Sequence, residues 1–307
     1  MSRRLVITAD DVGLDLPAVR AVADLARAGR LTAVSIIPMA ASATRALAQI
    51  GRVNGVASRD VPGGRPPVSI GLHATFTSDL APGNWGPRSA RASLKQPETG
   101  QFHSRVVDFA AVARPEDVLA ELRAQIAWFR DAGVNPTHLD SHHGAIYGLA
   151  GPSFLRVALQ ACAENGLALR MPRRIPAEVW VSRTARLAHE RAVAAADELG
   201  VALPETITTE WRPGDALAGY AELRHSYLTM LRRLPEGLSE IFLHPSPPPA
   251  RGADIPPWLA KRVWEHRLLQ DDEFSDTLSA EGIEVVSWPR LATTAEARQR
   301  WSVAPAR

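Results

Sequence analysis

Four short apolar segments of the chain lead into side chains that can bind a metal ion or exchange a proton. These side chains are Asp10 and Asp11 after LVITA, His73 after VSIGL, His142 and His143 in THLDSHH, and His244 after EIFL. Each apolar segment has the length of a buried strand. The carboxyl ends of parallel strands open on one face of an α/β sheet or barrel, so we expect these groups to converge there. Carboxylates and imidazoles together predict a metal-dependent hydrolase.

The adjacent carboxylates Asp10 and Asp11 have room for two different roles. Successive residues of an extended strand point to opposite sides, so one carboxylate can bind a metal while the other accepts a proton. The structural alternative is that Asp11 caps a turn into the next helix, with Gly13 supplying the turn. Taken alone, the DDVG sequence favours the turn, because Asp and Gly are common turn residues.

The segment THLDSHHG is more specific, since it holds three histidines and an aspartate within six residues. Along a regular strand, His138, Asp140 and His142 would share one face. Asp140 could then orient the second ring nitrogen of a metal-binding His142. A His/Asp cluster of this density is typical of a metal site. The alternative is a polar loop with accidental histidines.

His73, His244 and Arg170 are less specific when each is considered alone. His73 could be a core histidine whose ring is satisfied by the backbone. His244 precedes Pro245, which ends its strand, and it could be a proton donor, support the metal site or simply meet solvent. Arg170 follows the apolar segment LAL and could pair with a catalytic carboxylate, bind substrate or form a surface salt bridge.

Considered jointly, these residues divide the work of amide hydrolysis among themselves. Asp11, His73 and His142 supply one carboxylate and two imidazoles, a ligand set that suits Zn²⁺ and similar ions with water in an open position. Such an ion lowers the pKa of water toward ~7 and polarises a carbonyl. Asp10 could take the proton of that water, and His244 could protonate the leaving amine.

The elements that must position these groups alternate between strands and helices. Seven strands are predicted, over residues 5–9, 32–37, 68–72, 137–140, 167–170, 240–244 and 283–288. Helical patterns lie between them and hairpin turn signals are scarce, so the prediction is a parallel βα fold closed or nearly closed into a barrel. We expect one domain over residues 1–307, with a long loop at about 76–104 and an insert at about 172–215. Loops of that length in compact domains are usually lids or binding loops.

Composition narrows the function classes. The chain has 307 residues, 46% hydrophobic and 22% charged, as expected of a soluble globular protein. Its formal charge of +2 and its scattered arginines give no polybasic stripe, which argues against nucleic acid as a partner. The lone cysteine, Cys162, excludes an internal disulfide. With no long apolar segment at the start, we expect no secretory signal or membrane span and a cytoplasmic location.

At these residues the sequence resembles the YdjC/ChbG/HpnK family of carbohydrate deacetylases, relatives of the NodB-type polysaccharide deacetylases. The matching segments occur in family order over roughly residues 4–292: ITADDVGLD, TAVSIIPMA, IGLHATFT, PTHLDSHH, LALRMP, FLHPS and GIEVVSWPRL. Ordered motifs are far more specific than any one alone. The resemblance implies a seven-stranded βα-barrel-like fold and removal of N-acetyl groups from amino sugars with a divalent metal.

Carried over to this chain, the resemblance places the metal on Asp11, His73 and His142 and makes Asp10 the base. It matches His244 to a family histidine near the site and Arg170 to a strand-end arginine that supports the carboxylates. Asp140 and His143 are then expected to bind substrate or to support the ligands. Zn²⁺ or Mg²⁺ is the expected ion, and Mn²⁺ or Co²⁺ also suits such a site. Family analogy further suggests a homo-oligomer.

The chain departs from the family at two positions, where Gly144 and Ile146 stand in place of histidines. If either family histidine contacts substrate or a second metal, specificity differs here. Aromatic residues that could stack on a sugar or pack under the loops lie in or near the long loop and the insert: Trp85, Phe102, Trp180 and Trp211.

The expected function is therefore hydrolysis of an N-acetyl group from an amino sugar or an N-acetylated saccharide conjugate, with release of acetate. Such an enzyme is a hydrolase of non-peptide C–N bonds in linear amides, and its partner is a small N-acetylated saccharide. Two alternatives stay open. One is a metal-dependent hydrolase of a different amide or acyl substrate. The other is a saccharide-binding homologue that has lost the chemistry, to which the departure at Gly144 and Ile146 gives some weight.

Overall fold

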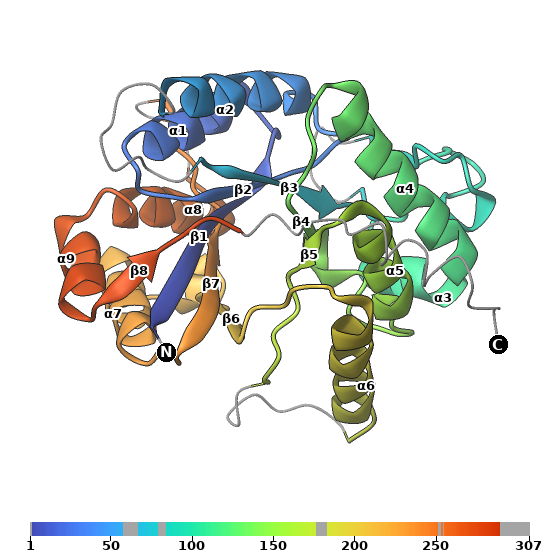
Figure 1. The fold of residues 1–307 in the computed structure, drawn as a ribbon. Coiled ribbons are helices and arrows are strands. Elements are labelled where there is room, and N and C mark those ends of the chain that lie inside the picture. Colours follow the sequence, from blue (N-terminus) through green and yellow to red (C-terminus); the bar gives the residue numbers. More distant parts are fainter. Residues whose placement is uncertain are drawn as a thin grey trace. The chain divides into compact units, whose positions relative to one another are not determined.

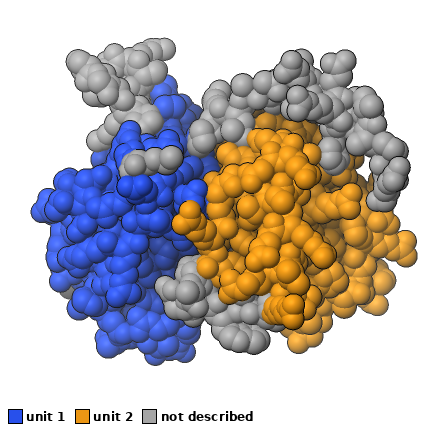
Figure 2. Space-filling model, turned by 60° about the horizontal axis from the view of Figure 1, so that its bottom comes forward, with its two compact units in different colours: residues 1–36, 41–70, 204–288 blue, residues 37–40, 71–203, 289–307 orange. Residues whose placement is uncertain are grey.

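The computed structural model describes residues 2–57, 67–78, 84–175, 183–250, 253 and 255–288. The chain divides into two compact units, coloured separately in Figure 2. The first unit comprises residues 1–36, 41–70 and 204–288, and the second comprises residues 37–40, 71–203 and 289–307. The expected organisation as one domain stays a prediction, and each unit is described by itself.

The first unit is built around a long buried strand, β1 (Arg3–Val12). β1 pairs in parallel with three strands: β2 (Ala33–Ile36), β7 (Gly237–Leu243) and β8 (Ile283–Val285). β6 (Thr206–Thr208) pairs in parallel with β7. The β1–β7 register ends with Ala9 beside Leu243, and the next residues after these two are Asp10 and His244.

Five α-helices accompany these strands in the described part of the first unit (Figure 1). They are α1 (Leu16–Arg27), α2 (Ala43–Ala57), α7 (Tyr220–Arg232), α8 (Pro257–Leu268) and α9 (Asp272–Ala280). α1 shows why such segments fold: Asp15 caps its N-terminus by accepting from the Ala18 N–H at 2.7 Å. Val19, Val22 and Leu25 lie at helical spacing and are buried. α1 therefore starts within a few residues of Asp11 and fixes the chain direction after β1.

The second unit carries β4 (His138–Ser141), β5 (Ala168–Leu169) and most of β3 (Ser69–Ala74), which enters it at Gly71. β4 pairs in parallel with both β3 and β5. Its helices are α3 (Val106–Val112), α4 (Pro115–Asp131), α5 (Leu155–Asn165) and α6 (Arg183–Leu199), with short 3₁₀ turns η1 (Ala92–Leu94) and η2 (His142–Gly144). α4 lies beside α5 in Figure 1, and Gly166 ends α5 in the left-handed conformation, as a helix stop requires.

All pairings between the named strands of the described residues are parallel, and helices connect the strands. The predicted α/β class, a parallel fold related to βα barrels, is confirmed, and all seven predicted strands are present. One further strand, β6, was not predicted because its three residues lie half-buried within the 172–215 insert. That insert also contains α6, and its residues 176–182 lie outside the described part of the chain.

The long loop at 76–104 is held to the second unit by a buried carboxylate. Glu121 on α4 accepts from the backbone N–H groups of Arg88 and Ser89 and from the side-chain amide of Gln125. Gln125 in turn hydrogen-bonds both the N–H and the carbonyl of Thr75, two residues after His73. The loop, of which residues 79–83 lie outside the described part, is thus tied to the end of β3.

Among the helices of the described residues, none combines the length and the apolar character needed to cross a membrane.

Candidate active site

The end of β1 is distorted where the two adjacent carboxylates lie. Pairing with β2 is regular up to Ala9 and resumes at Val12 after an irregularity. Within this irregularity, Asp11 has a φ of 56°. This left-handed conformation is energetically unfavourable for residues other than glycine. The simple strand alternation predicted for Asp10 and Asp11 is therefore interrupted. Both carboxylates are nonetheless buried, as expected of groups that belong to an enclosed site.

Asp11 has a partner that its sequence neighbourhood does not reveal. The guanidinium of Arg262, on α8 of the same unit, donates to the Asp11 carboxylate. Gly13, two residues on, has a φ of 111°, and its carbonyl accepts from the Ser42 N–H at 2.8 Å. The predicted turn at Gly13 is present, but Asp11 does more than form a turn, because its carboxylate accepts from the Arg262 guanidinium.

His244 follows the end of β7 in the first unit and is half-buried. Its backbone N–H donates to Oε2 of Glu265 on α8 at 2.7 Å, and its Nδ1 lies 3.9 Å from that same oxygen. The ring also meets Phe242 edge-on, with centroids 6.1 Å apart. The reading of His244 as a histidine that only meets solvent is therefore wrong.

In the second unit, His73, Asp140 and Arg170 form a buried chain of contacts across three neighbouring strand ends. Nδ1 of His73 lies 2.7 Å from Asp140 Oδ1, and Arg170 lies 2.8 Å from Asp140 Oδ2. The register of β3 and β4 places His73 directly opposite Asp140. All three side chains are at most 4% exposed. The reading of Arg170 as a surface salt bridge is therefore wrong.

The charge state of Asp140 settles which nitrogen of His73 carries the proton. Burial alone would raise the pKa of Asp140, but the Arg170 guanidinium and His73 outweigh it and hold the pKa well below the usual range. An ionised carboxylate only accepts hydrogen bonds, so Nδ1 of His73 must be the donor. The lone pair of neutral His73 is then on Nε2, the arrangement of a metal-binding histidine with a carboxylate behind it.

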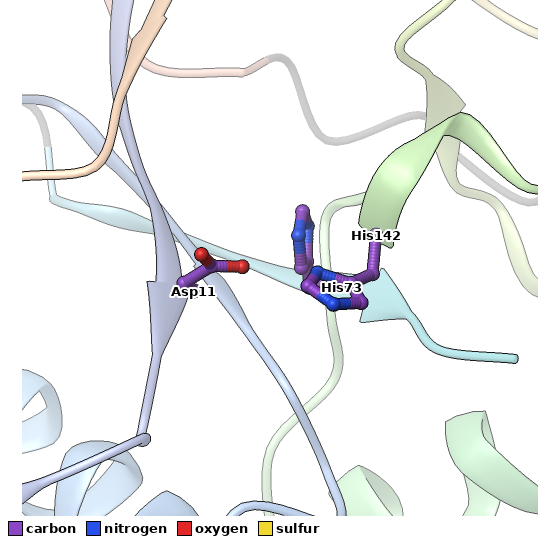
Figure 3. Close-up of side chains that lie close together, drawn as sticks. All are labelled: Asp11, His73 and His142. Atoms are coloured by element: carbon purple, nitrogen blue, oxygen red, sulfur yellow. The ribbon is translucent and has the colours of Figure 1, made fainter. Parts of the chain in front are cut away.

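His142 does not continue β4, as the expected strand face required. It begins the 3₁₀ turn η2, and the next residue, His143, has a φ of 52°. The buried ring of His142 lies 5.3 Å from that of His73 and 4.1 Å from that of His143, which stacks on it and is exposed. Figure 3 shows the His73 and His142 rings beside each other, and it also draws Asp11, at the end of β1. The second unit thus brings together two buried histidines, His73 and His142, and the buried carboxylate of Asp140.

His138 lies beneath this cluster and is fully buried. Burial lowers the pKa of His138 to about 3, so the ring is neutral. Its Nδ1 lies 2.9 Å from the Thr137 hydroxyl. A Cβ added to Gly71 would lie 2.2 Å from its Nε2, so the ring occupies space that only glycine leaves on β3. His138 is a core histidine and not a second ligand on the face of His142.

A family model described as YdjC-like protein matches residues 4–280. The chain belongs to the YdjC-like family. A carbohydrate deacetylase of Brevibacillus brevis is 27% identical over 55% of this chain and 59% of its own length. A chitooligosaccharide deacetylase of Klebsiella pneumoniae is 29% identical over 60% of this chain and 66% of its own length. The match to these curated relatives therefore covers less than two thirds of their length.

A solved structure of an Enterococcus faecalis protein, described as a cellobiose-phosphate cleavage protein, shares the fold of this YdjC-like chain. Its TM-score is 0.69 at 22% identity, and the match covers 94% of this chain and 98% of the other. A likeness of this extent supports the assignment of the whole chain to one fold class.

The two departures from the family's histidines have different physical consequences in this YdjC-like chain. Gly144 has a φ of 64°, so it takes a conformation in which glycine is favoured. Ile146 is fully buried and packs in the core, so a side chain at this position faces apolar surroundings. Gly144 is half-exposed next to His143, whereas the side chain at position 146 lies in the core.

Of the four aromatic residues singled out in the sequence, two pack into the second unit. Trp85 is 8% exposed, with its ring 6.2 Å from that of His142, and Phe102 is fully buried. Trp211 of the first unit is 69% exposed and meets Phe242 edge-on at 5.5 Å. Trp180 lies outside the described residues. Trp211 is therefore the one of the three described residues with a ring open to a ligand.

Sequence reasoning missed Arg262 and Glu265, the α8 partners of Asp11 and His244. Both lie in the helical stretch PWLAKRVWEHRL, where charged residues at these positions are typical of a solvated face. The only available signal was that a strand-end aspartate and a strand-end histidine need partners. The sequence does not say which of the chain's many arginines and glutamates supply them.

Proposed function

We propose that this chain is a metal-dependent N-deacetylase that removes an N-acetyl group from an amino sugar or an N-acetylated saccharide conjugate and releases acetate. One observation carries the proposal: Asp140, held ionised by Arg170, fixes Nδ1 of His73 as the donor and leaves Nε2 for a metal, beside His142. The comparisons also support the proposal, because two proteins of similar sequence are named carbohydrate deacetylase and chitooligosaccharide deacetylase.

Asp11, His73 and His142 are the proposed metal ligands. All three are buried, and each offers one ligand atom. One carboxylate oxygen and two imidazole nitrogens are the donor set of a catalytic zinc site, in which a position is left for water. Zn²⁺ or Mg²⁺ is the expected ion, and Mn²⁺ or Co²⁺ fits the same donors. A divalent ion held there would acidify water and polarise the acetamide carbonyl.

Asp10 and His244 are the proposed acid–base pair. Asp10 is 5% exposed and follows Ala9, the last residue of β1 that pairs with β7, and His244 follows Leu243, the partner of Ala9. In the forward reaction Asp10 accepts a proton from the attacking water, and His244 donates a proton to the departing amine. The products are acetic acid and the amino sugar, which leave as acetate and the protonated amine. The step balances because Asp10 takes one proton from water while His244 gives one to nitrogen, and both groups are restored when the proton on Asp10 returns to His244.

Asp140, Arg170 and His143 are proposed to support the ligands or to meet substrate. Asp140 fixes the tautomer of His73, and Arg170 keeps Asp140 charged within its buried surroundings. His143 stacks on His142 and is exposed, so its ring is the one of the pair that a substrate can reach. An amphipathic ring such as the exposed Trp211 suits the mixed polar and apolar surface of a sugar.

The test is acetate release from a matched panel. It contains N-acetylglucosamine, its short oligomers and N-acetylglucosamine conjugates, and beside them N-acetylated amino acids and N-formyl peptides without a sugar. We expect release from one or more sugar substrates only. Release from non-sugar amides alone would instead assign a different acyl substrate. Tight binding of the oligomers with no release from any substrate would indicate a saccharide-binding homologue.

The cytoplasmic location, the absence of a nucleic-acid partner and the homo-oligomer expected from the sequence stay predictions.

A further inference from the structure

Glu265 is a buried carboxylate for which neither the proposed chemistry nor the sequence motifs have assigned a role. It lies on α8 of the first unit and is fully buried. Its Oε1 accepts from the hydroxyl of Tyr227 on α7 at 3.0 Å, and its Oε2 accepts from the His244 N–H at 2.7 Å. Burying a carboxylate is costly unless its oxygens are satisfied, so two dedicated donors indicate a position that the fold maintains.

The oxygen that receives the His244 N–H also faces the His244 ring. Oε2 lies 3.9 Å from Nδ1, which is close enough for a favourable charge interaction but too long for a hydrogen bond. The backbone contact fixes the end of β7 relative to α8. The same carboxylate oxygen therefore lies next to both the backbone N–H and the Nδ1 of His244.

Both oxygens of Glu265 are acceptors, Oε1 from the Tyr227 hydroxyl and Oε2 from the His244 N–H. Burial raises the pKa of Glu265 above its usual range, and Lys261, the His244 N–H, the Tyr227 hydroxyl and Arg262 offset only part of that rise. Tyr227 is itself held by the Thr209 hydroxyl and the Glu210 N–H, so its hydroxyl hydrogen is free to point at Glu265. Burial and the carboxylate beside it raise the pKa of Tyr227, so it stays a protonated donor.

We propose that Glu265 is the positioning residue of His244: it holds Nδ1 as the protonated nitrogen facing the protein and leaves Nε2 as the nitrogen that exchanges a proton. A carboxylate behind an imidazole is a general means of fixing its tautomer. The catalytic consequence rests on the proposed role of His244 as proton donor, but the tautomer does not.

The test variant is Glu265→Gln. The amide oxygen of glutamine can accept the His244 N–H, and its NH₂ group can donate to the Tyr227 oxygen, so the packing and both hydrogen bonds can persist while the charge is lost. Tyr227→Phe is the matched control, because it removes the other hydrogen bond of Glu265 and leaves the carboxylate facing His244.

The readout is the ¹⁵N spectrum of histidine-labelled protein at a pH where the ring is neutral, with the His244 signals assigned by His244→Gln. In the wild-type chain and in Tyr227→Phe we expect Nδ1 to give the signal of a protonated nitrogen and Nε2 that of an unprotonated one. In Glu265→Gln we expect this preference to be lost. Identical His244 signals in the wild-type chain and Glu265→Gln would overturn the proposal.

Acetate release separates this proposal from that of the function. If His244 is the proton donor, Glu265→Gln should lower kcat at least about tenfold with KM little changed, and His244→Gln should lower it by about 10²–10⁴-fold. An altered tautomer in Glu265→Gln with unchanged acetate release in His244→Gln would support the positioning by Glu265 and remove His244 from the proposed reaction.

Discussion

The Asp140 carboxylate accepts a hydrogen bond from Nδ1 of His73 at 2.7 Å, and both side chains are buried at the ends of neighbouring strands. This contact gives a strand-end histidine a defined tautomer, with Nε2 available to a metal ion. Groups behind a metal ligand commonly matter almost as much as the ligand, so Asp140 is the first place to test the site outside the ligands themselves.

Asp140→Asn should weaken metal binding by about 10–100-fold, because Nδ1 of His73 loses its charged acceptor. It should also destabilise the protein by about 3–5 kcal/mol, because Arg170 is left as a buried charge without its carboxylate. Metal titration by calorimetry and urea unfolding measure the two effects. The control is Asp197→Asn, which breaks an exposed ion pair with Arg173 on the same unit. Equal metal affinity in both variants would contradict the role of Asp140.

Asp10→Asn should abolish turnover while metal still binds. Asp10 is proposed to accept the proton of water and not to hold the ion, and a positioned base contributes about 10²–10⁴-fold in rate. Acetate release and metal content are measured on the same protein, beside Asp24→Asn, an exposed aspartate of α1. If Asp10→Asn loses the metal together with the activity, Asp10 is a ligand and the division of roles at the end of β1 must be reversed.

Gly71→Ala should disturb the site from below. The added methyl group would lie 2.2 Å from Nε2 of His138, so the buried ring must move, at a cost of about 1–3 kcal/mol. Because His73 lies two residues along β3, metal affinity should fall as well. Gly51→Ala on α2 meets no atom within 4 Å and should instead stabilise the protein by about 0.5–1 kcal/mol. Denaturant unfolding compares them, and equal stability of the two variants would contradict the packing of His138 against Gly71.

His138 should make the metal-free protein sensitive to acid. Burial lowers the pKa of His138 to about 3, against about 6.5 in the unfolded chain. Between these values the unfolded state binds the additional proton, so stability rises with pH, by about 1.4 kcal/mol per pH unit from this group. Its contribution is complete above about pH 6.5 and is lost as the pH falls toward 3.

The measurement is urea unfolding with chelator at several pH values from 4 to 7. His138→Gln should lower the slope of the unfolding free energy against pH by about 1.4 kcal/mol per pH unit, which corresponds to one proton. His225→Gln, at an exposed position of α7, should leave the slope unchanged. Parallel curves for the wild-type chain and His138→Gln would mean that the buried ring does not stay neutral.

Much of the framework could be predicted from the sequence because parallel strands bury both faces and read as continuous apolar segments. The residue that follows such a segment lies at the carboxyl end of a strand, which is why the sequence could place Asp10, His73, Arg170 and His244 at strand ends. β6 could not be predicted, because three half-buried residues are too few to show the alternation that distinguishes a strand from a loop.

Two local departures from regular strand geometry could not be predicted, one at Asp11 and one at His142, because each occurs where the strand pattern ends. Asp11 has a φ of 56° within an irregular pairing, and His142 opens a 3₁₀ turn where the alternation of His138 and Asp140 was expected to continue. Periodicity assumes a regular strand and cannot report its last residue. The partners Arg262 and Glu265 were unpredictable for a different reason, since tertiary contacts across some 250 and 21 residues leave no local signal.

The central claim is that one divalent ion, held by Asp11, His73 and His142, is required for deacetylation, and metal reconstitution tests it most directly. The chelated protein would be titrated with Zn²⁺, and separately with Mg²⁺, Mn²⁺ and Co²⁺, while acetate release from an N-acetylglucosamine oligomer is followed. Asp11→Ala and the exposed-site control Asp24→Ala would be treated in the same way. We predict that activity returns in proportion to bound metal up to one ion per chain, in the wild-type chain and Asp24→Ala but not in Asp11→Ala. Full acetate release by protein verified to be metal-free, or by Asp11→Ala, would contradict the account.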